Sequence, residues 1–174
     1  GFDALLAIDA SAYLPGFSDK EALLSLLTLP ERFKFTNSVQ AWGFLLHQLG
    51  YVDGKFLMKK WKVSREFATA ITHFLSAYRK RQVAAFSLED LYQHHLSSLL
   101  LVENLFEAQG LDTDFEHIAV LDNTLQIRDK KEIVVSAGEI MKQFSISPGP
   151  GIGKLFHEIE MAIVIGKLRN HPDD

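Results

Sequence analysis

Apolar residues recur at intervals of three and four positions along most of the chain, which is the spacing of a helix that buries one face. The clearest repeat follows a turn of prolines and glycines at 148–153 and runs from Ile152 to Ile163. It predicts a helix of roughly four turns with one buried face. Gly166 favours a stop for this helix, since glycine readily adopts the left-handed conformation that ends helices.

Cap residues and breakers divide the rest of the chain into further helices. Ser, Thr, Asp or Asn before an apolar repeat favours a helix start, and Gly or Pro after it favours a stop. The stretch around Ile133 to Val135 is the exception, because its pattern predicts extended backbone. The predicted fold class is all-α, an irregular multi-helix array with a small helical C-terminal subdomain. The expected helices cover residues 1–12, 18–29, 38–49, 54–63, 65–81, 88–109 and 115–121, with a short helix that begins at 136.

The character of the sequence changes after Leu125, where the helical repeat is lost for about ten residues. We therefore expect a helical body domain over residues 1–125 and a helical tail subdomain over residues 126–174. The helix over 88–109 is apolar all round and is the expected core of the body. The chain has no initial Met and ends in residues typical of a helix start, so it is interpreted as a fragment, truncated at both ends.

Composition narrows the class of protein. Of the 174 residues, 47% are hydrophobic, which suits a compact core, and no run of 18 apolar residues predicts a membrane span. We expect no membrane association. The absence of cysteine excludes disulfides and thiolate metal sites, and a cytoplasmic location is the default.

Charge is segregated along the chain, although the net charge is only −4. Residues 54–81 carry eight Lys and Arg against one Glu, a net +7, while residues 82–125 carry eight acids and no Lys or Arg. Such segregation can steer a polyanion to one side of a molecule. The alternative, that the two segments are neighbours that neutralise each other, stays open. Within the basic segment, Trp61 is expected to pack in the core, as most aromatic residues do.

Patterns typical of catalysis are absent from the sequence, so no catalytic or metal-binding residue is assigned. The seven histidines include no pair four positions apart with an intervening glutamate, and adjacent His94 and His95 point about 100° apart on a helix. The glycine turn is not a Walker loop, because Leu155 follows Gly153-Lys154 where Ser or Thr is needed. Its amides, at the start of a helix, can hold a phosphate, or the turn can simply connect two helices.

Four motifs stand in order along the chain: WGFLLHQLG at 42–50, FLMKKWKVS at 56–64, EIVVSAGEIM at 132–141 and PGPGIGKLFHEIEMAIVIGKLRN at 148–170. Together they resemble the C-terminal half of bacterial CCA-adding tRNA nucleotidyltransferases. The resemblance covers most of the chain and is strongest towards its end. Two departures stand out: the family's Gly-x-Asp positions hold Ala137 and Glu139, and Gly151 occupies the usual position of a tryptophan.

In such enzymes an N-terminal head carries the catalytic carboxylates, a neck selects the nucleotide, and a helical body and tail grip the tRNA. The resemblance implies that this chain is a body and tail that bind tRNA and hold no cofactor. It implies a parent enzyme that adds CCA to tRNA 3′ ends with Mg, ATP and CTP, and a homodimer is one arrangement for it. Correspondence with the tail, and less directly with the body, gives these RNA-phosphate candidates: Arg128, Lys130, Lys131, Gly149, Gly151, Gly153, Lys154, Lys167, Arg169, Lys59, Lys60 and Lys62.

Two other functions stay open at this point. One is a DNA-binding helical module in which residues 149–153 act as a glycine-rich hairpin that holds a phosphate. The other is a helical protein-interaction domain that binds no nucleic acid. A poly(A) polymerase of the same superfamily is close kin to the favoured hypothesis.

Overall fold

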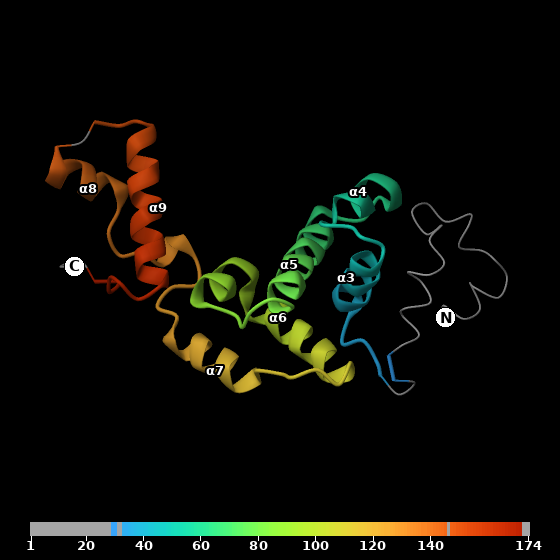
Figure 1. Cartoon of the computed structure of the whole chain (residues 1–174). Coiled ribbons are helices and arrows are strands. Elements are labelled where there is room, and N and C mark those ends of the chain that lie inside the picture. Colours follow the sequence, from blue (N-terminus) through green and yellow to red (C-terminus); the bar gives the residue numbers. More distant parts are fainter. Residues whose placement is uncertain (1–28, 31–32, 146, 172–174) are drawn as a thin grey trace. The chain divides into compact units, whose positions relative to one another are not determined.

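The computed structural model describes residues 29–30, 33–145 and 147–171, and within these residues every regular element is a helix (Figure 1). The prediction of an all-α fold is therefore confirmed. The helices expected over residues 1–12 and 18–29 fall outside the described residues except for the last position of the second. The elements are α3 (Ser38–Gln48), α4 (Lys55–Trp61), α5 (Arg65–Arg81), α6 (Leu88–Ala108), α7 (Phe115–Thr124), the short 3-10 helix η3 (Lys130–Glu132), α8 (Ala137–Phe144) and α9 (Pro150–Val164).

Side-chain caps fix the starts of several helices where the sequence predicts them. The Asn37 side chain accepts a hydrogen bond from the Gln40 amide at the start of α3 (3.0 Å), and Ser64 accepts one from the Phe67 amide at the start of α5 (3.2 Å). Such bonds satisfy amides that have no partner inside the helix. At the other end of the chain, Gly166 follows α9 with a φ of +76°, as its predicted role as a stop requires.

Two capping boxes start the next helices. Ser87 and Asp90 exchange side-chain and backbone hydrogen bonds before α6, and Ser136 and Glu139 do the same before α8. The Glu139 carboxylate accepts hydrogen bonds from the Ser136 backbone amide and from the Ser136 hydroxyl. The amide has the larger effect, and both bonds lower the pKa of the Glu139 carboxyl. The N-cap of α4 is Gly54, which offers no side chain, and the neighbouring Asp53 side chain accepts a hydrogen bond from the Lys55 amide (2.8 Å).

The chain divides into two compact units that interleave in sequence. Unit 1 holds the described residues up to Ala85 together with Ser97–Phe115, and unit 2 holds Phe86–Leu96 together with the described residues from Glu116 onward. The domain boundary expected near residue 125 stays a prediction.

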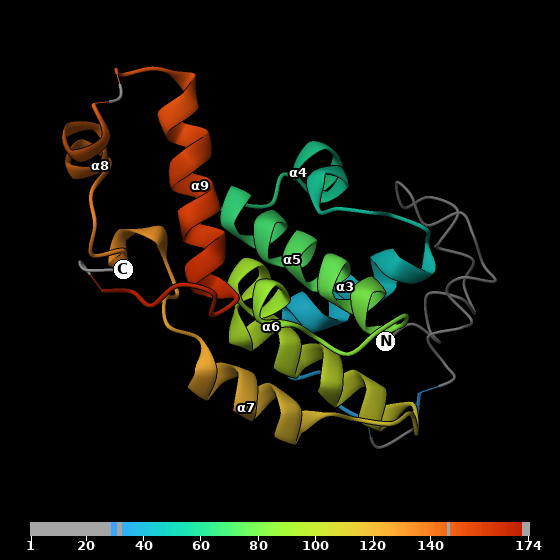
Figure 2. The same ribbon diagram turned by 60° about the vertical axis from the view of Figure 1, so that its left-hand side comes forward.

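Unit 1 is built on α3 and α5, which lie side by side in both views (Figures 1 and 2). Leu46, Ile71 and Leu75 are fully buried between α3, α4 and α5. The Trp42 and Trp61 rings pack against this cluster with their centroids 5.7 Å apart. The prediction that Trp61 packs in the core is confirmed.

The second part of α6 completes unit 1. Its Leu99, Val102 and Leu105 are fully buried, as the apolar sequence predicts. The Gln40 side chain donates a hydrogen bond to the Leu101 carbonyl (2.7 Å), which ties α3 to α6 across 61 residues of sequence. Because Gln40 is itself fully buried, this bond satisfies a polar group that burial would otherwise penalise.

The prediction of an uninterrupted helix over residues 88–109 is wrong at one position. His95 has a φ of 64° and a ψ of 150°, so α6 is kinked there. This backbone conformation is populated almost only by glycine, because a side chain clashes with its own backbone. The residues before the kink consequently belong to unit 2 and those after Leu96 to unit 1.

Unit 2 has a small core at the C-terminal end of α9, where Ile127, Ile163 and Val164 are buried. The helix α8 lies beside α9 (Figure 2) and contributes one buried side chain, Ile140. The prediction that one face of α9 is buried holds only for the C-terminal end of the helix. The apolar residues nearer its N-terminus, such as Leu155, are partly exposed. No strand forms at 133–135 in the described residues, since the 3-10 helix η3 leads directly into a bend there.

Candidate nucleic-acid interface

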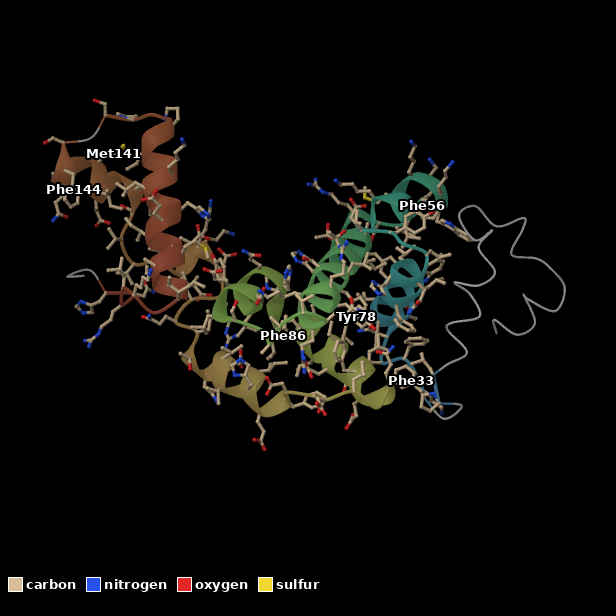
Figure 3. All side chains as sticks on the ribbon, in the orientation of Figure 1. Phe33, Phe56, Tyr78, Phe86, Met141 and Phe144 are labelled. Carbon is tan, nitrogen blue, oxygen red and sulfur yellow. The ribbon has the colours of Figure 1, made fainter. Side chains whose placement is uncertain are left out.

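Exposed basic side chains cover α4 and its junction with α5, in unit 1. Figure 3 shows nitrogen-tipped side chains projecting outward from α4. Lys55 forms a 3.5 Å ion pair with Asp53, while the other four cations have no carboxylate within ion-pair distance among the described residues. We refer to this surface as the α4 ridge: Lys55, Lys59, Lys60, Lys62 and Arg65.

The α4 ridge stands on a rigid base. Leu57 is fully buried under it, and the Phe56 ring, labelled in Figure 3, stacks on Tyr51 with a centroid distance of 4.4 Å. The Gly54 amide donates to the Thr72 hydroxyl (2.9 Å), and a Cβ on Gly54 would lie only 2.2 Å from a backbone oxygen of α5. The start of α4 can therefore approach α5 this closely only with glycine at this position.

The arginines at the C-terminal end of α5 have partners inside unit 1. Arg79 donates to the Val52 carbonyl (2.6 Å), and Arg81 pairs with the fully buried Glu103 and donates to the Asp112 carbonyl (2.9 Å). Of the two explanations for the segregated charge, mutual neutralisation holds for Arg81. It does not hold for the α4 ridge, so the positive charge of residues 54–81 remains accessible at one end of the segment.

The first group of predicted ligands in unit 2 is electrically balanced. The Arg128 guanidinium lies 2.5 Å from the Asp122 carboxylate, and this hydrogen bond raises the pKa of Arg128. The Arg128 amide donates to Glu132 (2.9 Å), and Asp129 caps η3 by accepting from the Lys131 amide (2.8 Å). The three cations of residues 128–131 thus lie among three carboxylates, although both lysines of η3 are exposed.

Asn170 and Gln126 clamp this segment to the end of the chain. The Asn170 side chain donates to the Glu132 carbonyl (2.8 Å) and accepts from the Val134 amide (3.0 Å), while its amide donates to the Gln126 side chain (3.0 Å). Gln126 in turn donates to the Leu168 carbonyl (2.9 Å). These bonds explain why an asparagine ends the C-terminal motif, a role that no local sequence pattern indicates.

The predicted ligands of unit 2 therefore fall into two groups, one at each end of α9. The clamp brings Arg128–Lys131 together with Lys167 and Arg169 at the C-terminal end. The glycines and Lys154 lie at the N-terminal end. Because α9 has 15 residues, the two ends are about 22 Å apart, and the structure does not bring the two groups together.

The glycine turn leaves the first turn of α9 uncapped. Gly149 is the N-cap, and no side chain bonds to the amides that follow it. A Cβ at Gly149, Gly151 or Gly153 would meet no atom within 4 Å, and none of the three has a φ in the left-handed region that favours glycine. Neither packing nor backbone conformation in the described residues requires glycine here, and Lys154 is exposed on the same turn.

A hydrogen bond between a tyrosine and a glutamate joins two parts of unit 2 that lie far apart in the sequence. The Tyr92 hydroxyl donates to the Glu160 carboxylate at 2.5 Å across 68 residues. Burial, followed by this hydrogen bond, raises the pKa of Tyr92, and the charges of Asp129 and Glu132 raise it further.

Within the part of the chain that the structure describes, no group of three or more His, Asp or Glu side chains is placed to hold a metal ion. None of the described helices is both long and apolar enough to cross a membrane.

The fold and its exposed cations define an all-α domain with a basic surface. The chain belongs to the family described as tRNA nucleotidyltransferase domain 2, putative, whose model matches residues 33–174. It is 42% identical to a CCA-adding enzyme of Streptococcus mutans and 38% identical to one of Streptococcus pyogenes, in both cases over 98% of this chain and 43% of the relative. The resemblance indicated by the sequence motifs is confirmed.

A solved structure shows the same fold. The crystal structure of Bacillus stearothermophilus CCA-adding enzyme in complex with CTP matches with a TM-score of 0.80 and 22% identity, over 93% of this chain and 42% of that chain. This chain thus spans less than half the length of the relatives that it matches.

Proposed function

We propose that this chain is the tRNA-binding C-terminal region of a CCA-adding tRNA nucleotidyltransferase, which adds CCA to tRNA 3′ ends in the cytoplasm. The observation that carries the proposal is the 42% identity to a CCA-adding enzyme over nearly the whole chain. The exposed cations of the α4 ridge, all but Lys55 without an acid partner among the described residues, support it, because phosphate contacts supply most of the affinity of RNA-binding surfaces.

The chemistry of nucleotide addition belongs to the rest of such a protein in this proposal. ATP and CTP are the substrates and Mg the metal that the resemblance implies. The described residues of this chain offer no group of side chains that fits a metal, so we derive no catalytic step through it. Whether the enzyme is a homodimer is part of the same proposal and can be measured by light scattering.

The role of this chain is to hold the RNA by its exterior. The phosphate ligands that we propose in unit 2 are the two groups at the ends of α9, and those in unit 1 lie on α4. Because Arg128 is engaged by Asp122, we expect its contribution to be the smallest of the predicted cations.

Binding of tRNA by the full-length protein over a salt series tests the proposal. We expect tRNA to bind more tightly than single-stranded DNA of equal charge, with a logarithmic affinity that falls linearly with the logarithm of salt concentration. Equal affinity for the two nucleic acids, or a flat salt dependence, would contradict the proposal. The DNA-hairpin and protein-interaction alternatives gain no support from the relatives, which are CCA-adding enzymes.

A further inference from the structure

The helix α6 begins with a first arm, residues 88–94, that belongs to unit 2. The Tyr92 hydroxyl donates to the Glu160 carboxylate of α9 (2.5 Å), across 68 residues of sequence. Tyr92 and Leu88 also pack against the buried cluster at the C-terminal end of α9. The first arm is thus fixed to α9 by a hydrogen bond and by apolar packing.

The second arm of α6, residues 97–108, belongs to unit 1. Its Leu101 carbonyl accepts a hydrogen bond from the Gln40 side chain of α3 (2.7 Å), and its Glu103 carboxylate pairs with Arg81 of α5. Each arm of α6 therefore has partners from distant parts of the sequence in its own unit. The backbone at the kink joins the two arms.

His95, at the kink, has a backbone conformation that suits a different residue. Its φ of 64° and ψ of 150° are populated almost only by glycine, so a helical conformation at this position would relieve strain. The apolar repeat of residues 88–109 continues across His95, so the local sequence favours one straight helix. Strain of this kind is worth about 5- to 150-fold in an equilibrium constant. That is the size of the gap between the two conformations of a typical switching element.

The chain also passes between the units before α6 and at the start of α7, and these two crossings run side by side. In unit 1, Arg81 donates to the Asp112 carbonyl (2.9 Å), and in unit 2 the His117 ring donates to the Phe86 carbonyl (2.8 Å). The three crossings therefore occupy two places, this pair and His95. A rotation about the line through two places leaves both in position, so the chain permits such a rotation without breaking any of its helices.

We propose that His95 is the hinge of a two-state helix: α6 is kinked in one conformer and straight in the other, and unit 2 turns relative to unit 1 as α6 changes between them. Hinges are commonly a few residues that absorb a large change in φ and ψ. Glycine at this position would favour the kinked conformer alone, whereas histidine keeps the two conformers close in free energy. The inference goes beyond the proposed function. Because the predicted RNA-phosphate ligands lie in both units, the turn changes the span between them.

Pulsed EPR distances between spin labels on the two arms test the hinge in the full-length protein, with any cysteine outside this chain replaced. This chain has no cysteine, so Glu89→Cys with Glu107→Cys places one label at an exposed position on each arm. The two positions are 18 residues apart in the sequence. They are separated by about five turns, which is about 27 Å in a straight helix and less in a kinked one. We expect two distances when His95 is present, one near that of the straight helix and one shorter.

Substitutions at and beside the hinge give the decisive comparison. His95→Gly should lower the population of the longer distance, relative to the shorter one, at least about fivefold, and His95→Ala should keep both distances. Gln93→Gly is the matched control, because it puts glycine at an exposed helical position of the first arm and should leave the ratio unchanged.

A rigid kink that is strained but does not move gives a different result. It would let His95→Gly raise the melting temperature without any change in the distances. That result, or a single distance when His95 is present, overturns the hinge. The proposed function is measured separately, by tRNA binding, and stands in either case.

Discussion

The buried ion pair between Arg81 and Glu103 offers a stringent test of how unit 1 is stabilised. The Glu103 side chain is fully buried. Its carboxylate accepts one hydrogen bond from the Arg81 guanidinium (2.5 Å) and another from the Asp114 backbone amide (2.8 Å). The guanidinium also lies 4.9 Å from the centroid of the Phe106 ring. Glu103→Ala removes the carboxylate and leaves a mostly buried guanidinium without its counter-charge.

The cost of this substitution follows from the loss of charge compensation. Removing one partner of a buried ion pair lowers the free energy of unfolding by about 3–5 kcal/mol. For a chain of this size each kcal/mol corresponds to about 2–4 °C in melting temperature, so the expected decrease is roughly 6–20 °C. Glu103→Gln restores an acceptor for the Asp114 amide but no charge, so its effect falls between that of Ala and the wild type.

Tryptophan fluorescence in urea is the appropriate assay, because both tryptophans of the chain lie in unit 1. Glu107→Ala on the same helix is the matched control: Glu107 is exposed, and we expect a change within about 0.5 kcal/mol. The double variant Arg81→Met with Glu103→Met should cost clearly less than the sum of the two single changes. A Glu103→Ala cost below about 1 kcal/mol, or strict additivity in the double variant, would refute this account.

Four further expectations concern single positions. Gly43→Ala places a Cβ 2.2 Å from the ring of the fully buried Phe74, so we expect at least about 2 kcal/mol of destabilisation in the same urea assay. Burial, with a smaller effect of a nearby arginine, lowers the pKa of His47 below 6.5 in the folded state. The free energy of unfolding should therefore decrease as pH falls below 6.5, because the unfolded state binds the proton more readily. His47→Gln should remove this part of the pH dependence of stability. Asn170→Ala removes two hydrogen bonds of the clamp, so amide exchange should accelerate in unit 2 and stay unchanged in unit 1. His95→Gly should be more stable than His95→Ala by about 1–3 kcal/mol, measured by thermal melting, because only glycine adopts the φ of 64° and ψ of 150° without strain.

The helices whose starts the sequence predicts correctly are those with local caps. Asn37, Ser64 and Ser136 each accept a hydrogen bond from an amide three residues ahead, so a stretch of four residues contains the signal for the helix start. The kink at His95 has no such signal, because a φ of 64° with a ψ of 150° is populated almost only by glycine and the sequence has histidine there. The apolar repeat of residues 88–109 continues across this position and therefore does not record the kink.

The difference between local signals and contacts between distant residues also decides how far sequence alone can identify the binding surface. Counting charges finds the basic segment at 54–81 but treats Arg81 and Lys59 alike. In the folded chain Arg81 is neutralised by Glu103, 22 residues away, whereas Lys59 has no acid partner among the described residues. A basic residue can bind a phosphate strongly only if its charge has not already been compensated by the fold, and that compensation depends on contacts between distant residues. Charge patterning therefore locates a candidate surface, and the pattern of internal ion pairs determines which of its residues remain available to RNA.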